Sequence, residues 1–472
     1  MSAVARSAAI PEEVDRLLRR HLLRRDRQED ICFALWRPSH GRTRQTALVQ
    51  SLLLPRTGDR NVHRNASFEP QYFERALMEA RRQGAGLALL HSHPFGARWQ
   101  GMSPDDVNAE RNNAPAVFGA TKLPFVGLTL AGDGAWSARF WERTAPRTYI
   151  RNWCGTVRIV GNEFRVTYMD DLAPPPPATG AQKRTISAWG DDCQADLVRR
   201  RVLVAGAGSV GGFIAESLAR TGFEDIMLMD FDTVKEHNLD RLCYATPTDV
   251  GRPKVDVLAD RLKSIATAAN FRVEALPLAV YEEEGFLAAL DCDAIFSCVD
   301  RPWGRYALNL IAYAHLIPVY DGGIAIRTNR HKKLIAADWR AHAATPGRAC
   351  LQCLGQYDSG FVQTEREGRL DDPKYIEALP ESHPLKMREN VFAFSMNCAS
   401  LQSLQMLAHV IAPLKQSNPG AQRYHFVGGF METADFPKCE PTCEYPSFIA
   451  EGDHAGIRLT GPDWPFLYQA VC

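Results

Sequence analysis

A glycine-rich turn between a strand and a helix most constrains the fold of this chain. Gly206, Gly208 and Gly211 follow the apolar run Val202–Ala205 and open a segment with helical spacing, Ser209–Thr221. Further predicted strands and helices alternate downstream of the turn. Alternation of this kind is typical of a mostly parallel, doubly wound sheet. The turn places backbone amides where they can approach a phosphate at a helix N-terminus.

The remaining elements of this second half follow from apolar runs and helical spacing. We expect strands at Asp225–Met229, Phe271–Leu276, Ala294–Cys298 and Pro318–Tyr320, and helices at Pro253–Ala269, Trp303–His315 and Met396–Val410. Four consecutive prolines at 174–177 form a stiff segment without helix or strand potential. We therefore divide the 472-residue chain into a first domain (1–170), a Pro-rich linker (171–183) and a second domain (184–472).

The first domain has an α+β order. We expect helices at Pro11–Arg25 and Pro70–Gln83, strands at Ile31–Trp36, Ala47–Leu54, Gly86–Leu90, Phe125–Leu130 and Trp136–Trp141, and a hairpin of Val157–Val160 with Phe164–Tyr168. The first helix carries arginines between its apolar residues. A basic amphipathic helix can lie on a membrane, but we expect this one to cover its own domain.

Two histidines follow the predicted strand Gly86–Leu90. His91 and His93, at i and i+2, point to the same side of a strand and can reach one metal ion. Asp106, in the pattern Ser103-x-x-Asp106 that opens a helix, is the expected third ligand. Zinc would lower the pKa of its remaining water ligand toward 7. Glu29, just before a predicted strand, is the best candidate for the base that takes the proton.

This pattern, Glu…His-x-His-Pro…Ser-x-x-Asp, resembles the JAB/JAMM (MPN) family of metal-dependent isopeptidases over about residues 11–141. The resemblance implies a JAB/MPN-like α+β domain in which His91, His93 and Asp106 bind zinc. It also implies that Glu29 is the acid/base and that Ser103 stabilises the tetrahedral oxyanion. More residues separate His93 from Ser103 than is usual in the family. A bulged loop is therefore expected at 95–102, and Asp105 competes with Asp106 as the ligand.

The residues after the glycine turn do not suit a nicotinamide-dependent dehydrogenase. Asp230 ends the next strand, where a carboxylate can bind ribose hydroxyls, as it would in a dehydrogenase. Asn238, Arg241 and Lys254 then follow, and two cations with an Asn suit a triphosphate that is attacked at its α-phosphorus. Asp300, at a later strand end, suits Mg²⁺, which prefers carboxylate and phosphate oxygens.

This second pattern is similar to that of the ThiF/MoeB and ubiquitin-activating enzyme superfamily, over residues 184–413. The resemblance implies ATP and Mg²⁺, with a phosphate loop at Gly206, Gly208 and Gly211, ribose binding by Asp230, phosphate contacts from Asn238, Arg241 and Lys254, and Asp300 acting with Mg²⁺. It also implies a homodimer, because the leading Arg of the family's entry segment, here Arg184, reaches the ATP of the neighbouring protomer.

Twelve cysteines in a long chain without a signal peptide favour reduced thiols and a metal site over disulfides. The ThiF-like resemblance implies a structural zinc site formed by Cys350, Cys353, Cys439 and Cys443. A thioester cysteine is not evident in the sequence. Cys398 falls within a helical apolar pattern, where core packing is expected, and Cys472 stays open as a candidate.

Together the two patterns predict a bifunctional enzyme that acts on the C-terminal tail of one ubiquitin-like (β-grasp) protein. One site would trim or remove this protein, and the other would adenylate its carboxylate. Such fusions resemble components of prokaryotic ubiquitin-like conjugation systems, in which a conjugating enzyme is a further partner. Sulfur-carrier activation and a non-catalytic scaffold are the alternatives. Zero net charge argues against nucleic acid and acidic membranes as main partners. We expect a cytoplasmic protein.

Overall fold

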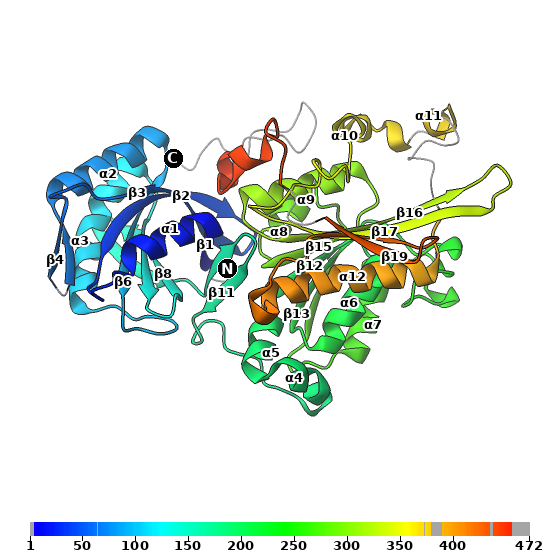
Figure 1. Cartoon of the computed structure of the whole chain (residues 1–472), viewed down its shortest axis with the longest axis horizontal. Coiled ribbons are helices and arrows are strands. Elements are labelled where there is room, and N and C mark those ends of the chain that lie inside the picture. Colours follow the sequence, from blue (N-terminus) through cyan, green and yellow to red (C-terminus); the bar gives the residue numbers. More distant parts are fainter. Residues whose placement is uncertain (1–3, 64, 372, 379–388, 435–437, 456–472) are drawn as a thin grey trace.

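The computed structural model describes residues 4–455 except 64, 372, 379–388 and 435–437. Two large sheets dominate it, an N-terminal sheet on the left of Figure 1 and a C-terminal sheet on the right. A small third sheet pairs β4 (Arg60–His63) with β5 (Asn65–Phe68). The mixed α/β class expected from the sequence is confirmed. No helix within the described ranges is long and apolar enough to cross a membrane.

The N-terminal sheet is mixed and has nine strands in the order β11-β10-β1-β3-β2-β6-β7-β8-β9. The strands are β1 (Ala5–Pro11), β2 (Ile31–His40), β3 (Arg44–Leu53), β6 (Gly86–His93), β7 (Phe125–Ala131), β8 (Trp136–Ala145), β9 (Thr148–Trp153), β10 (Thr156–Val160) and β11 (Phe164–Tyr168). Strand β1 pairs in parallel with β3 and β10, and β6 with β7. The hairpin β10–β11 was predicted, whereas β1 and β9 were not.

Three helices cover this sheet: α1 (Glu12–Leu22), α2 (Pro70–Gln83) and α3 (Pro104–Thr121). Alternate residues of β2 and β6 enter two separate cores, because side chains of a strand alternate between its faces. Cys32 and Leu90 pack in the core that contains the buried leucines of α1. Phe33 and Leu89 pack in the core that contains the buried residues of α2 and α3. Helix α1 therefore covers one face of the sheet, and α2 and α3 cover the other.

The C-terminal sheet has eight strands in the order β14-β13-β12-β15-β16-β17-β18-β19. Its first five strands are parallel, which confirms the predicted doubly wound arrangement, and the last four are antiparallel. The strands are β12 (Arg201–Ala205), β13 (Asp225–Met229), β14 (Arg272–Leu276), β15 (Ala294–Ser297), β16 (Val319–Thr328), β17 (Leu334–Ala344), β18 (Ala421–His425) and β19 (Phe430–Ala434). The antiparallel extension was not predicted.

Helices cover both faces of the C-terminal sheet, as Figure 1 shows. One face carries α6 (Ser209–Thr221), α7 (Lys254–Ile265) and α12 (Phe392–Ile411), and the other carries α8 (Glu283–Ala289) and α9 (Pro302–Ala314). The remaining helices are α4 (Lys183–Trp189), α5 (Asp191–Val198), α10 (Ser359–Arg366) and α11 (Pro373–Ala378). The glycine turn joins the carboxyl end of β12 to the first turn of α6.

The connection between the two sheets is shorter than the sequence predicted. Residues 174–179 have neither helix nor strand, as expected. However, the last part of the predicted linker forms a 3-10 turn (Gly180–Gln182), and α4 begins at Lys183. At the start of this turn the backbone N–H of Thr179 donates to Gln182 Oε1 at 3.3 Å, and the Thr179 hydroxyl donates to the carbonyl oxygen of Thr267 at 2.9 Å.

The two sheets share one junction. Ala9, Leu48 and Phe164 of the N-terminal sheet belong to the same buried core as Val202 of β12. Polar residues cross the junction as well, among them the buried carboxylates of Asp291 and Asp293.

Asp293 accepts from Arg44 at 2.6 Å, from Arg158 at 3.2 Å and from the backbone N–H of Arg201 at 3.1 Å. Burial opposes the ionisation of Asp293, but the charges of Arg44 and Arg158 outweigh it and hold the pKa of Asp293 below its usual range.

Replacing Asp293 by Ala should strongly destabilise the chain. The substitution leaves Arg158, which is fully buried, beside Arg44 without a counter-charge, and breaking a buried ion pair on one side costs about 3–5 kcal/mol. Denaturant unfolding measures this loss. Glu163→Gln removes one member of the more exposed Arg165–Glu163 pair in the same region and should leave the unfolding midpoint almost unchanged. Equal midpoints for the two variants would contradict the importance of Asp293.

Candidate functional site

Three potential metal ligands meet at the end of β6. The alternation along β6 directs His91 and His93 to the face covered by α3, and their Nε2 atoms lie 3.2 Å apart. Asp106, in the first turn of α3, places Oδ1 3.6 Å from His91 Nε2 and Oδ2 3.7 Å from His93 Nε2. One ligand atom from each residue lies within 4.8 Å of the others. Two imidazoles and a carboxylate at this spacing suit a zinc ion.

The N-terminal cap of α3 fixes the position of Asp106. Ser103 Oγ accepts the backbone N–H of Asp106 at 3.2 Å, and the backbone N–H of Ser103 donates to Asp106 Oδ2 at 2.9 Å. Ser103 Oγ also donates to Oδ2 at 2.8 Å. This capping box selects Asp106 rather than Asp105 for the cluster. The expected oxyanion role of Ser103 would require its hydroxyl to turn away from Asp106.

The electrostatics of the cluster suit metal ligation. Burial lowers the pKa of His91 to about 3, so its imidazole is neutral and has a free lone pair. The carboxylate of Asp106, 3.7 Å away, raises the pKa of His93 above its usual value. Burial opposes the ionisation of Asp106, but the nearby imidazole of His93 and the hydrogen bonds from Ser103 outweigh it and keep the pKa of Asp106 below its usual range.

Glu29 lies beside this cluster. Ile31 of β2 pairs with His91 in an antiparallel register, and continuing this register two residues back puts Glu29 opposite His93. The Glu29 carboxyl is half-buried, and burial raises its pKa, while the charges of His93 and Asp106 act on it in opposite directions. A carboxyl whose pKa is raised by burial beside metal ligands suits proton transfer near neutral pH.

A buried ion pair, which the sequence did not indicate, lies beside His91. Arg139 of β8 donates to Glu110 of α3 at 2.9 Å and to Thr129 Oγ1 of β7 at 2.6 Å. Thr129 Oγ1 lies 3.3 Å from His91 Nε2, and Trp141 Nε1 donates to Glu110 at 2.6 Å. A charged residue at an inward position of a predicted strand is the only sequence signal for this support.

The glycine turn at the end of β12 has a geometry that side chains would block. Gly206 has a φ of +99°, and a Cβ added there would lie 2.5 Å from the carbonyl oxygen of Cys298. A Cβ at Gly211 would overlap the carbonyl oxygen of Gly206, whereas one at Gly208 would meet no atom within 4 Å. The turn therefore packs tightly against β15 on one side and stays open at Gly208, the N-cap of α6. The free N–H groups of this helix end suit a phosphate.

Two further predicted residues lie beside the turn. Asp230 follows β13, and its oxygens accept the backbone N–H groups of Ala207 at 2.7 Å and Asp232 at 2.8 Å. Burial raises the pKa of Asp230, and the charge of Lys254 opposes the shift. Lys254 is buried at the start of α7 and donates to Asp232 Oδ2 at 2.6 Å. The chain thus holds a carboxylate and an ammonium group near the glycine turn.

The remaining predicted residues of this half differ in their surroundings. Asn238 is buried and accepts the backbone N–H of Lys235 at 3.1 Å. Arg241 bonds locally to Asp240 at 2.8 Å. Asp300 is exposed just after β15, two residues beyond the Cys298 carbonyl that touches the turn. Arg184 is exposed on α4, so its predicted contact with a neighbouring protomer stays a prediction.

Four cysteines form a second metal-type cluster on the C-terminal half. The sulfur atoms of Cys350, Cys353, Cys439 and Cys443 lie within 4.8 Å of one another. The backbone N–H groups of Cys350, Cys353 and Glu440 point at cluster sulfurs at 3.2 to 3.4 Å. Four thiolates at this spacing can hold a structural zinc ion in spite of the extra residue between the last two cysteines.

The two candidates for a thioester cysteine are Cys398 and Cys472. Cys398 of α12 is fully buried, and burial raises the pKa of its thiol to about 12. Such a thiol is a packed core residue rather than a nucleophile, which agrees with the packing role that we expected. Cys472 lies outside the described residues.

Comparison with known proteins places one family on the second half of the chain. The model of the ThiF family matches residues 181–444 and leaves residues 1–180 outside the match. The molybdopterin-synthase adenylyltransferase of Escherichia coli (strain K12) is 30% identical over 167 residues, which are 35% of this chain and 62% of that protein. The tRNA threonylcarbamoyladenosine dehydratase 2 of Saccharomyces cerevisiae is 33% identical over 157 residues, which are 33% of this chain and 35% of that protein.

The matched region thus spans less than two thirds of each of these relatives. Among solved structures, Escherichia coli MccB with ATP is similar at 17% identity and a TM-score of 0.42, over 57% of this chain and 74% of that chain.

The geometry of the glycine turn gives a direct test. Gly206→Ala should destabilise the fold by at least about 1–2 kcal/mol, the cost of a left-handed conformation for a residue with a Cβ, because the Cys298 carbonyl adds a clash. Gly208→Ala is the matched control, since Gly208 has a φ of −73° and open space. Chemical denaturation of the two variants measures the difference. A Gly206→Ala protein as stable as the Gly208→Ala protein would refute the described turn.

Proposed function

The chain belongs to the ThiF family, whose model matches more than half of its length, and we propose that its C-terminal half is an ATP-dependent adenylyltransferase. We propose that its substrate is the C-terminal carboxylate of a ubiquitin-like protein. The observation that carries this proposal is the glycine turn at the N-terminus of α6, with Asp230 bonded to its backbone and Asp300 on the adjacent strand end.

The proposed reaction follows from the groups around the turn. A carboxylate oxygen of the substrate attacks the α-phosphorus of ATP, the bond from that phosphorus to the bridging oxygen breaks, and pyrophosphate leaves. Asp230 binds the ribose, and the amides of the turn bind phosphate oxygens. Asn238, Arg241 and Lys254 stabilise the charge that develops on the leaving pyrophosphate, and Asp300 would hold Mg²⁺, which would neutralise part of the phosphate charge. Arg241 must leave its local bond to Asp240 to do so.

For the N-terminal half we propose a zinc-dependent peptidase of the JAB/JAMM (MPN) type. It would trim the same ubiquitin-like protein or remove it from a target. The cluster of His91, His93 and Asp106 carries this proposal, because two imidazoles and one carboxylate are the donor set of a catalytic zinc site. A zinc ion bound there would supply a water ligand with a pKa near 7.

The other residues of this half then have defined tasks. Glu29 accepts a proton from the attacking water and returns it to the leaving amine nitrogen. Ser103 orients Asp106 through the capping box and, after turning its hydroxyl, donates to the oxyanion. Arg139 holds Thr129 beside Nε2 of His91, and the Thr129 hydroxyl must leave this nitrogen when zinc binds it. Homodimerisation through the C-terminal half is part of the proposal, because Arg184 is exposed and available to a second protomer.

A second candidate function is the activation of a sulfur-carrier protein, in which the product would be a thiocarboxylate. The similarity to a molybdopterin-synthase adenylyltransferase favours it. The burial of Cys398 removes one candidate for a thioester cysteine. Conjugation and sulfur-carrier activation would share the adenylation step. A purely scaffolding role accords poorly with two sites whose proposed groups are all present.

Adenylation is tested by pyrophosphate exchange with candidate ubiquitin-like proteins. Exchange should depend on the protein substrate, and Asp300→Ala should reduce it by about 10²-fold or more, because it removes the proposed Mg²⁺ carboxylate. His91→Ala is the matched control and should keep the wild-type rate, since His91 belongs to the other site. Exchange without any protein substrate, or exchange that Asp300→Ala leaves intact, would refute the assignment.

The peptidase is tested with a ubiquitin-like protein fused through its C-terminus to a reporter. Glu29→Gln should slow cleavage by about 10²–10⁴-fold, the usual contribution of general acid–base catalysis, while the zinc content measured by mass spectrometry stays unchanged. His91→Ala should lose both cleavage and zinc. Glu13→Gln, at an exposed glutamate of α1, should have no effect. Cleavage that a chelator does not inhibit would disprove the zinc mechanism.

A further inference from the structure

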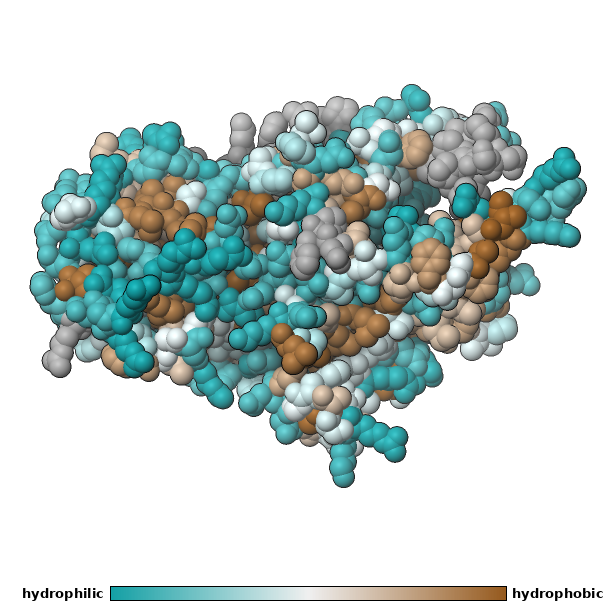
Figure 2. Space-filling model, viewed as in Figure 1, coloured by the Kyte–Doolittle hydropathy of each residue, from teal (hydrophilic) through white to brown (hydrophobic). Residues whose placement is uncertain are grey.

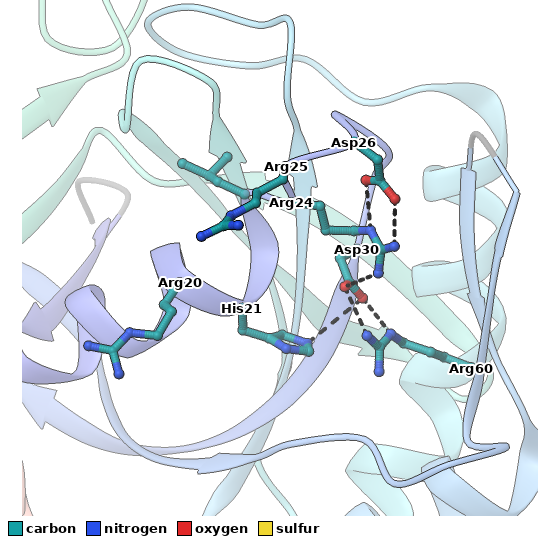
Figure 3. A pocket seen from close by; sticks show the side chains of 8 residues that line it. Arg20, His21, Arg24, Arg25, Asp26, Asp30 and Arg60 are labelled. Carbon is teal, nitrogen blue, oxygen red and sulfur yellow. Dashed lines mark hydrogen bonds and ion pairs between the residues drawn. The ribbon is translucent and has the colours of Figure 1, made fainter.

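A basic pocket lies at the carboxyl end of α1 and has a volume of about 390 Å³. It is open to solvent, and Figure 3 shows its polar lining. The residues that line it are Arg20, His21, Leu23, Arg24, Arg25, Asp26, Asp30 and Arg60. Four of these eight residues are arginines, although the chain as a whole has no net charge. Neither of the two proposed activities uses this pocket.

The acidic groups of the basic pocket are already neutralised. Asp30 is buried and pairs with Arg60 at 2.5 Å and with Arg24 at 3.4 Å. Arg24 also pairs with Asp26 at 2.6 Å. Two arginines thus balance the two aspartates.

Arg20 and Arg25 remain in surplus. In the part of the chain that the structure describes, neither of their side chains has an ion-pair or hydrogen-bond partner, and Figure 3 marks no bond from either of them to the other lining residues. The basic pocket therefore offers two uncompensated positive charges.

The position of the basic pocket links it to the proposed peptidase centre. Asp30, in its wall, directly follows Glu29. Its backbone N–H donates to Ser92 Oγ at 3.1 Å, and its carbonyl accepts the N–H of Ser92, the residue between the two histidines, at 3.1 Å. The pocket and the metal cluster therefore lie on opposite faces of the same strand ends. Phe95, directly after the His-x-His-Pro segment, is 79% exposed, and the Arg27 guanidinium lies 5.9 Å from its ring centre.

The packing of α1 argues against a membrane as the occupant. Leu18 and Leu22 are fully buried against the sheet, and Leu17 is the one exposed large apolar residue of α1, so the helix has no continuous apolar face to insert into lipid. Its outer side faces the viewer in Figure 1, and the same area of Figure 2 is mostly hydrophilic. A small pocket with two free cations instead suits a single anionic group.

We propose that the basic pocket binds an acidic side chain of the protein whose tail enters the peptidase centre. This inference rests on the proposed peptidase function. A glutamate or aspartate of the substrate would pair with Arg20 and Arg25, while Arg24, Arg60 and His21 keep Asp30 in place. The pocket thereby selects substrates that carry a carboxylate at a fixed distance from the scissile bond, and it contributes to binding rather than to the chemical step.

Fluorescence anisotropy tests this proposal with the full chain and two labelled nonapeptides that differ only in carrying three glutamates or three glutamines. At low salt the glutamate peptide should bind about five- to tenfold more tightly, as expected for two partly exposed ion pairs. Arg20→Gln/Arg25→Gln should abolish this preference without changing the thermal unfolding midpoint, because both side chains are exposed. Arg16→Gln, on the same helix and outside the pocket, should retain it.

Other outcomes would overturn the proposal. They are equal binding of the two peptides, or a preference that survives in the double variant. Binding of vesicles with 30% phosphatidylserine, lost in the double variant while the peptides do not bind, would show a membrane site instead.

Cleavage assays separate this proposal from the peptidase function itself. Chelator-sensitive cleavage by the wild type, with a KM that rises about fivefold or more in the double variant and an unchanged kcat, supports both. Chelator-sensitive cleavage with an unchanged KM in the double variant would contradict only the pocket proposal. Absence of cleavage by the wild type would refute the peptidase function, and the peptide measurements would still decide whether the basic pocket binds carboxylates.

Discussion

The arrangement of the two halves depends on the ion pairs that the buried carboxylate of Asp293 makes with Arg44 and Arg158. Three donors meet at it, from two strands of the N-terminal sheet and from the first residue of β12. Moving these charges out of water is costly, and only their close mutual contacts repay the cost. The apolar core that surrounds them continues from one sheet into the other. The two halves therefore pack directly against each other.

Both candidate sites use the same structural device, since their residues sit where strands end. On the N-terminal sheet, β6 ends with two histidines, and a helix cap brings the aspartate to them. On the C-terminal sheet, β12, β13 and β15 end side by side and present the glycine turn, Asp230 and Asp300. Strand ends combine a rigid support with free polar groups, and this combination suits chemistry that demands fixed geometry.

Local sequence signals predicted much of this structure, and long-range contacts account for the rest. The helix Pro70–Gln83 and the strand Asp225–Met229 have the predicted bounds, because their apolar periodicity is complete within the segment. Strand β1 was not predicted, because the strands that pair with it, β3 and β10, lie far from it in the sequence. The histidines and Asp106 were found through residue type and short spacing, and the four cysteines through the resemblance to the ThiF-like superfamily. The support of His91 by Arg139 and the pairing of Arg44 with Asp293 join segments that no local pattern connects.

The contact between Gly206 and the Cys298 carbonyl has a consequence for how the C-terminal half responds to its ligands. Because the backbones touch without an intervening side chain, the turn that we propose to bind phosphate and the strand end that precedes Asp300 cannot shift independently. A displacement of one is therefore transmitted directly to the other. Binding of a nucleotide and binding of a divalent cation should accordingly be coupled.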